Sequence, residues 1–283
     1  MANVLSMAKK VAVVTALVEG CSINSTVRMT GVAKTTILRL LEEVGMACAE
    51  AQDRLVQNVS AKRVQVDEIW SYCYAKAKNV TPKIAEERIA GDVWTFAAMD
   101  ADSKLVLSWV VGRRDAGFAA DLLHDVAARL STRVQLTTDG HKMYLEAVPE
   151  AFGPRVDFAQ LVKVYGNDPE GQKRYSPAQL RASEKVRVIG TPDPKFISTS
   201  YIERQTLTTR MQNRRYTRLT NGFSKKIENH MHQVALFYFW YNFCRTHSTL
   251  KTTPAVAAGV SSHAWSIQEI VALTSPQTLQ SAA

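Results

Sequence analysis

Cysteines are few in this chain of 283 residues, and they stand far apart. No two of them have the close spacing of a zinc ligand set, and the six histidines do not cluster with them. The spacing therefore predicts no zinc site and favours free thiols in a reducing compartment. The four cysteines are Cys21, Cys48, Cys73 and Cys244.

Long apolar runs are also absent. The longest strongly apolar stretch, 234–243, covers about ten residues, whereas a helix that crosses a bilayer needs about 20. The start of the chain, with Lys9, Lys10 and an apolar run up to Cys21, mimics a lipoprotein signal peptide. That run is short, and Glu19 stands where a small neutral residue is needed. We therefore expect neither a membrane span nor a cleaved leader.

Negative charge is almost missing from residues 204–251. Nine basic residues there face one acidic residue, Glu228, so the segment carries eight of the nine net positive charges of the chain. A solvated protein surface normally mixes both signs. Nucleic acid and an anionic membrane are both candidate partners for such a segment. Its basic residues are Arg204, Arg210, Arg214, Arg215, Arg218, Lys225, Lys226, Arg245 and Lys251.

Residues 1–58 are predicted to form a small helical module. Valines at helical spacing indicate a first helix that ends at Gly20, and Ser25 is expected to cap a short helix over 26–30. After a turn at Gly31, a third amphipathic helix is expected to close at Gly45, followed by a helix with a polar tail to about residue 58. This pattern is typical of a DNA-binding helix-turn-helix, although an ordinary three-helix bundle fits it too. The expected DNA contacts at the start of the third helix are Lys34, Thr35, Thr36 and Arg39.

From residue 62 the pattern changes to strands and helices in mixed order, which favours an α/β domain over 62–250 with a mixed sheet flanked by helices. An irregular insert is expected at about 160–200, and a loosely attached tail over 251–283. Single strands are predicted over 63–70, 133–140 and 155–158, and a hairpin over 92–114 with its turn at 101–104. Helices are predicted over 118–130, 142–147, 201–219 and 228–243.

Three acidic residues stand where a metal site would need them. Asp67 lies in the first predicted strand, Asp139 ends a later strand before Gly140, and Glu203 opens a helix. Carboxylates from separate elements, without His or Cys, suit hard cations such as Mg²⁺ or Mn²⁺. Two such ions can serve an in-line phosphoryl displacement. Arg210, two helical turns after Glu203, is expected on the same helix face, where it could clamp a phosphate.

Other acidic residues compete for these roles. Strand alternation predicts that Glu68 points to the sheet face opposite Asp67. Asp100 and Asp102 fit a hairpin turn. Glu228 also precedes a helix and is the main rival of Glu203 as the third acid.

Several motifs together resemble the transposases of bacterial insertion sequences, in the group related to the first-named insertion sequence. The motifs are QVDEIW, VVGRR, TTDGH, STSYIERQTLTTRMQNRRYTRLTNGFSKK and YNFCRTHSTLKTTPAVAAG. The resemblance implies a ribonuclease-H-like core with an Asp-Asp-Glu triad at Asp67, Asp139 and Glu203, which would bind two Mg²⁺ or Mn²⁺ ions. It departs from the family in two ways: the usual Glu-Arg-Asn is Glu203-Arg204-Gln205, and no Cys-rich finger is present. A further resemblance covers Tyr241, Asn242, Arg245 and His247, for which we expect a capping or packing role.

On this resemblance we expect a transposase that cleaves the ends of a mobile element and transfers the free 3′-hydroxyl into target DNA. It would act as a homodimer or larger assembly, in the bacterial cytoplasm at the nucleoid. Two other functions remain open: a transposase-derived DNA-binding regulator without catalysis, and a ribonuclease-H-like nuclease that does not join strands. The DNA-binding residues expected in the basic segment are Arg204, Arg210, Arg214, Arg215, Arg218, Lys225 and Lys226.

Overall fold

The computed structural model describes residues 5–87, 89–166, 180–217 and 220–275. Three helices open the chain: α1 (Met7–Val18), α2 (Ile23–Thr30) and α3 (Lys34–Leu55). Ser22, rather than Ser25, caps α2, because its side chain accepts the Ser25 backbone N–H at 3.0 Å. The described part of the chain contains no helix long and apolar enough to cross a membrane.

The third helix is longer than expected, because Gly45 does not end it. The helix runs unbroken over Lys34–Leu55 and packs along α8 (Ile227–Phe243). A side chain at Gly45 would place its Cβ 2.6 Å from the Cβ of His232 on α8. The glycine therefore serves the close approach of two helices, and the prediction of a helix end at this position was wrong.

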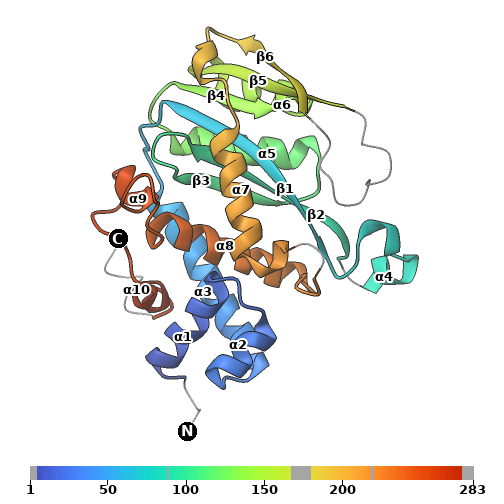
Figure 1. Ribbon diagram of the computed structural model, residues 1–283, viewed down its shortest axis with the longest axis vertical. Coiled ribbons are helices and arrows are strands. Elements are labelled where there is room, and N and C mark those ends of the chain that lie inside the picture. Colours follow the sequence, from blue (N-terminus) through green and yellow to red (C-terminus); the bar gives the residue numbers. More distant parts are fainter. Residues whose placement is uncertain (1–4, 88, 167–179, 218–219, 276–283) are drawn as a thin grey trace.

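A six-stranded mixed sheet forms the centre of the molecule (Figure 1). Its order is β3-β2-β1-β4-β5-β6, in which β1 pairs antiparallel with β2 and parallel with β4. The pairs β2–β3 and β5–β6 are antiparallel, and β4–β5 is parallel. This order is the ribonuclease-H-like arrangement, so the predicted fold class is confirmed. The strands are β1 (Arg63–Cys73), β2 (Gly91–Asp100), β3 (Val106–Gly112), β4 (Val134–Asp139), β5 (Val156–Tyr165) and β6 (Leu180–Ile189).

Helices cover both faces of this sheet. On one face α7 (Ser200–Gln212) crosses β1 and β2, and in Figure 1 it lies in front of the strands. On the other face α5 (Ala116–Arg129) contacts β2 and β3, and α6 (Tyr144–Phe152) packs against α5. The smaller elements are η1 (Ala77–Asn79), α4 (Pro82–Glu87), η2 (Gly153–Arg155), η3 (Pro194–Phe196), η4 (Arg214–Tyr216), α9 (Pro254–Ala257) and α10 (Ile267–Ala272).

One hydrophobic core connects the helical module with the sheet. It runs from α1 and α3 through α8 to the strands, and it includes Val14, Leu41, Phe237 and Phe96. Hydrogen bonds reinforce this junction: Gln52 on α3 donates to the carbonyl of Val106 at 3.0 Å. The module therefore packs directly against the rest of the protein.

Two segments are more ordered than the sequence predicted. The expected irregular region, 160–200, contains the second half of β5 and the whole of β6. The expected tail contains α9 and α10, and Ile270 and Val271 of α10 are fully buried beside α1. The predicted helix over 201–219, by contrast, already ends at Gln212.

Candidate functional site

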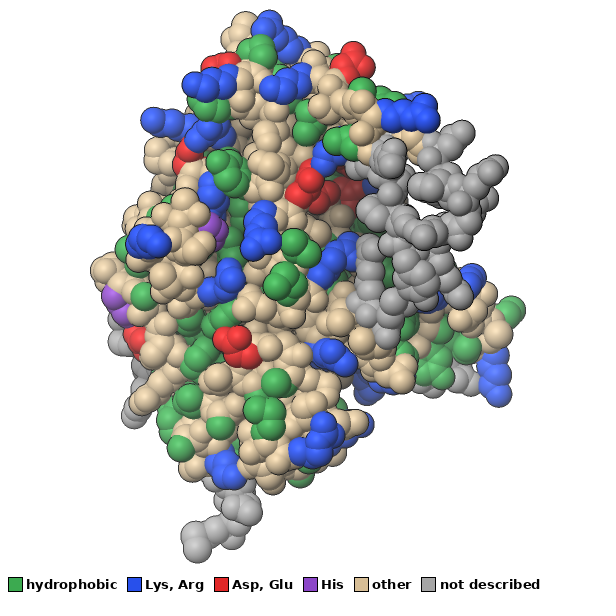
Figure 2. Space-filling view, in the orientation of Figure 1, with side chains coloured by type: hydrophobic (Ala, Val, Ile, Leu, Met, Phe, Trp, Pro, Cys, Tyr) green, Lys and Arg blue, Asp and Glu red, His purple; other side chains and the backbone are tan. Residues whose placement is uncertain are grey.

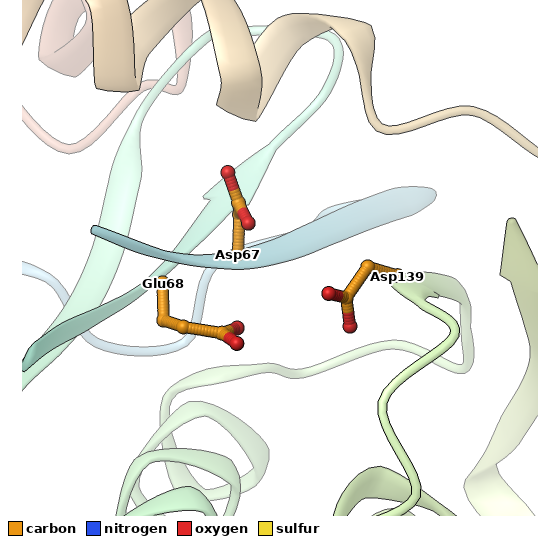
Figure 3. A group of neighbouring side chains, drawn as sticks. All are labelled: Asp67, Glu68 and Asp139. Atoms are coloured by element: carbon orange, nitrogen blue, oxygen red, sulfur yellow. The ribbon is translucent and has the colours of Figure 1, made fainter. Parts of the chain in front are cut away.

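The strands β1 and β4 are paired only over Arg63–Gln65, and acidic residues follow this pairing on both strands. Asp67, Glu68 and Asp139 each offer one carboxylate oxygen, and these three oxygens lie within 4.8 Å of one another. Figure 3 shows Asp67 and Glu68 leaving β1 on opposite sides, with Asp139 facing them from the end of β4. The predicted alternation of Asp67 and Glu68 is visible in this view, yet the Glu68 carboxylate still reaches the group.

A cavity of about 500 Å³ opens at this group of carboxylates, and we call it the acidic cavity. Glu203, in the first turn of α7, contributes to its lining together with Asp67 and Asp139. The fold thus brings together three residues that are far apart in the sequence. Glu228, the rival third acid, lies in the first turn of α8 and does not line this cavity. The other lining residues are Gly140, His141, Leu161, Val162 and Lys163.

Glu68 is fully engaged by neighbouring side chains. Its Oε1 accepts hydrogen bonds from the guanidinium of Arg114, with Nε at 2.8 Å, and its Oε2 accepts from the hydroxyl of Tyr144 at 2.9 Å. Only 1% of the Glu68 side chain is exposed. A buried carboxylate needs such partners, because burial of an uncompensated charge is costly. Glu68 therefore ties β1 to α6 and to the segment after β3. The sequence did not reveal Arg114 or Tyr144.

Asp67 lacks such compensation. The pKa of its carboxyl is raised to about 7, mainly by burial and next by the neighbouring charge of Glu68, with smaller contributions from Asp139 and Glu203. A backbone hydrogen bond at Glu68 acts in the opposite direction. Among the residues that the structure describes, no ion pair to a cationic side chain offsets this repulsion. A divalent cation would offset it. The site therefore fits a hard metal ion held by carboxylate oxygens, such as Mg²⁺ or Mn²⁺.

Glu203 and Asp139 are held by different contacts. The Glu203 carboxylate forms an ion pair with Lys163 of β5, and it accepts a hydrogen bond from the Thr199 hydroxyl. The Asp139 carboxylate accepts the backbone N–H of His141 at 3.0 Å. Lys163 is a basic residue at the acidic cavity that the sequence patterns did not single out.

The segment after Asp139 is fixed by Gln160 on β5. Its amide donates to the carbonyls of Asp139 and His141, both at 3.0 Å. A Cβ at Gly140 would lie 3.0 Å from Cγ2 of Val162, so a larger residue would crowd the cavity wall. These contacts hold Asp139 at the end of β4.

We expect Asp67→Asn to change how the stability of the metal-free protein depends on pH. The native carboxyl binds a proton up to about pH 7, whereas the unfolded one releases it near 3.8. The unfolded state therefore binds fewer protons between these values, so wild-type stability falls as the pH rises from 4 to 7. The variant should lack this fall and exceed the wild type by up to about 4 kcal/mol at pH 8.

Thermal unfolding in a chelator, compared at pH 5 and pH 8, measures this difference. Added Mg²⁺ at pH 8 should raise the Tm of the wild type and leave that of Asp67→Asn unchanged. A wild-type Tm that is indifferent to both pH and Mg²⁺ would contradict the metal assignment.

The predicted DNA contacts of the helical module lie at the molecular surface. α2 ends at Thr30 and is capped by Gly31, which adopts the left-handed conformation (φ 69°), and α3 begins at Lys34. Lys34, Thr35 and Arg39 are exposed, and Thr36 is partly buried. These side chains are accessible to a partner at the start of α3.

The predicted contacts in the basic segment fall into different environments. Arg204, Lys225 and Lys226 are exposed, and Arg218 lies outside the described residues. Arg210 is half-buried and is not among the residues that line the acidic cavity. The predicted phosphate contact of Arg210 therefore stays a prediction.

A cavity of about 300 Å³ connects this segment with the helical module. Its lining includes Lys34 from the start of α3 and four basic residues from the segment before α8. Arg214 and Arg215 each have a buried Nε without a hydrogen-bond partner among the described residues. Lys34 thus shares one cavity with basic residues from a distant part of the sequence. The four basic residues are Arg214, Arg215, Lys225 and Lys226.

The fold and the acidic cavity define an α/β protein with a ribonuclease-H-like sheet and a cluster of carboxylates in the middle of β1 and at the end of β4. No protein-family model matches the chain, and no curated protein matches it. Among solved structures, it is similar to a chain of the cryo-EM structure of a piggyBac transposase synaptic complex with hairpin DNA. The identity is 10%, the similarity covers 97% of this chain and 72% of the other, and the TM-score is 0.39. A likeness this weak assigns neither a family nor a function.

Proposed function

We propose that this protein is a DDE-type transposase of a bacterial insertion sequence. The observation that carries the proposal is the convergence of Asp67, Asp139 and Glu203, from β1, β4 and α7, on one cavity. The motifs around these residues are those that resemble the insertion-sequence transposases. The net positive charge of residues 204–251 supports DNA as the partner, because Lys and Arg neutralise backbone phosphates.

Asp67, Asp139 and Glu203 would hold two Mg²⁺ or Mn²⁺ ions. When bound, such ions supply activation of a water or a 3′-hydroxyl and stabilisation of the leaving oxygen in an in-line displacement at phosphorus. Neighbouring residues position the carboxylates for this chemistry. Glu68 stays with Arg114 and Tyr144 and keeps β1 in place, so that Asp67 faces α7.

Lys163 has a second role in this proposal. In the metal-free site it pairs with Glu203 and neutralises part of the negative charge. With Glu203 among the residues that hold the metal, the Lys163 ammonium would be left without this partner beside the cavity. There it would bind a phosphate oxygen of the DNA strand as a point charge.

The helical module over 1–58 would bind the element end through Lys34, Thr35, Thr36 and Arg39, and the domain over 62–250 would perform catalysis. The basic residues Arg214, Arg215, Lys225 and Lys226 would follow the DNA backbone between them. Because both ends of an element must be held together, we propose a homodimer or larger assembly.

A strand-transfer assay tests this function. Duplexes with the terminal sequence of the element and a pre-cut 3′-hydroxyl are incubated with target plasmid, full-length protein and Mg²⁺. We expect joined products, and nicking of uncut ends in a parallel reaction. Nicking without joining would indicate a nuclease. DNA binding without nicking or joining by the intact protein would indicate a regulator.

A further inference from the structure

A second polar cavity lies against another face of α7. It has a volume of about 290 Å³, and we call it the α7–α8 pocket. Its wall combines one face of α7 with Lys104, from the turn after β2, and with the chain just after α8. In the view of Figure 2, acidic side chains lie on one side of the line of α7, and a histidine among Lys and Arg side chains lies on the other. The residues that carry the argument are Lys104, Arg204, Gln205, Thr208, Arg245 and His247.

The α7–α8 pocket is cationic and contains no acidic lining residue. Neither Arg204 nor Arg245 forms a salt bridge within the described part of the chain. Lys104 lies 3.2 Å from the ring centroid of Tyr201 and is the one cation with carboxylates, Asp100 and Asp102, behind it. The Lys104 ammonium also donates to the carbonyl of Ala101, so Arg204 and Arg245 are the two cations of the pocket that lack a negative partner within the described residues.

The pKa of His247 reflects the same accumulation of positive charge. Burial lowers the pKa of its imidazole, and the charges of Lys104, Arg245 and Arg204 lower it further. All three cations are thus close enough to the ring to disfavour a fourth positive charge. An anion in the pocket would relieve this repulsion.

An unsatisfied hydrogen-bond donor points to the same kind of ligand. Gln205 is 2% exposed, and its Oε1 accepts from the Thr209 hydroxyl at 3.1 Å. Its Nε2 has no acceptor among the residues that are described. Buried polar groups are almost always paired, so an unpaired amide in a pocket wall calls for an acceptor oxygen. Two guanidinium groups without a carboxylate partner and an unpaired N–H donor are groups that bind a phosphate.

The α7–α8 pocket also explains a motif to which the sequence assigned no chemistry. Of its four residues, Asn242 is structural: its side chain bonds the N–H and the carbonyl of Val106 at 2.9 and 2.8 Å. Tyr241, Arg245 and His247 line the pocket instead. Tyr241 also belongs to the hydrophobic core, and Nδ1 of His247 accepts the backbone N–H of Thr249 at 3.3 Å, as expected of packing and capping residues. The Arg245 guanidinium has no carboxylate partner within the described residues and is the member of the motif that is open to an anion.

We propose that the α7–α8 pocket binds a phosphate group of the DNA strand whose neighbouring segment enters the acidic cavity. This inference rests on the proposed function, because it takes DNA as the source of the phosphate. The geometry supports that source: Arg204 and Gln205 in the pocket directly follow Glu203 in the acidic cavity on the same helix. One strand passing α7 would meet both sites.

The test is the binding of labelled single-stranded and duplex oligonucleotides to the full chain, without metal, across a series of salt concentrations. We expect Arg245→Gln to weaken binding roughly tenfold and to reduce the slope of log Kd against log salt by about 0.7 to 0.9, as for one lost phosphate contact. Arg204→Gln, at an exposed position, should change the Kd and the slope by similar amounts. Gln205→Glu should weaken binding more, because it adds a negative charge.

Arg155→Gln is the matched control, since it removes the same charge from an exposed position in η2, outside the pocket. Its Kd and slope should equal those of the wild type. Arg245→Lys should restore the slope, which a purely structural role of Arg245 would not predict. Unchanged Tm values verify that the variants fold. If Arg245→Gln does not fold, the Kd and the slope of Arg204→Gln test the pocket instead.

The outcomes separate the two proposals. If the wild type binds and nicks DNA while Arg245→Gln and Arg204→Gln keep its Kd and slope, the pocket inference is wrong and the function stands. If the wild type binds no DNA, the proposed function fails first. A Tm increase with inorganic phosphate at matched ionic strength that Arg245→Gln abolishes, without any effect of that variant on DNA binding, would assign the pocket to free phosphate and overturn the DNA assignment.

Discussion

Glu203→Gln is expected to reduce Mg²⁺-dependent DNA cleavage by on the order of 10³-fold, while DNA affinity stays within a few-fold of the wild type. Glutamine keeps the size of the side chain and an acceptor for the Thr199 hydroxyl, but it is a poor ligand for a divalent cation. The change also releases Lys163 from its ion pair. Cleavage of a labelled plasmid and oligonucleotide binding, measured on the same preparation, check both parts.

The stability of Glu203→Gln distinguishes a chemical role from a structural one. The ion pair of Glu203 with Lys163 is partly exposed, so its loss should cost no more than about 1 kcal/mol. Glu228→Gln is the matched control, because Glu228 lies outside the acidic cavity and should keep full cleavage. If Glu228→Gln loses cleavage and Glu203→Gln keeps it, Glu228 and not Glu203 is the third acidic residue of the site.

Gly45→Val should destabilise the protein by about 3 kcal/mol or more, which corresponds to a Tm decrease of roughly 10 °C. A Cβ at Gly45 would lie 2.7 Å from both the Cα and the carbonyl oxygen of His232, so the clash involves backbone and cannot be relieved by a rotamer change. The helices α3 and α8 would have to separate. Thermal or urea unfolding measures the effect.

Gly117→Ala provides the comparison for a helical glycine without this constraint. A Cβ there would approach only Oδ1 of Asp115, at 3.4 Å, which is an ordinary contact. Because alanine favours the helix over glycine, this variant should be neutral or slightly more stable. Equal losses at Gly45 and Gly117 would show that helix propensity, rather than close packing, explains the result.

The main elements could be predicted from the sequence because their apolar periodicity was strong. The strand β6 was missed for a physical reason: it pairs with β5 at the edge of the sheet, and most of its side chains are exposed and polar, so no alternation marks it. Gly45 was misread because a glycine that ends a helix and a glycine that lets two helices touch are identical in sequence. Only the partner helix distinguishes them.

The candidate site was predictable in part. Asp67, Asp139 and Glu203 were selected from strand ends, helix starts and family motifs, and the structure places them at one cavity. Arg114 and Tyr144 could not be found, because their link to Glu68 exists only after β1, α6 and the segment following β3 have come together. Lys163 was hidden in a segment that was expected to be irregular. Long-range contacts of this kind leave no local pattern.

The backbone contact at Gly45 has a geometric consequence for the proposed reaction. At Gly45 the backbone of α3 approaches α8 closely, and Gln52 and Asn242 both bond Val106 of β3. The start of α3 and the carboxylates therefore belong to one packed unit with a shared hydrophobic core. If α3 binds the end of the element, the packing of α3 on α8 fixes the distance between the base pairs that α3 contacts and the phosphodiester bond that is cleaved. The offset of the cleavage point would then be set by helix packing and not by the DNA.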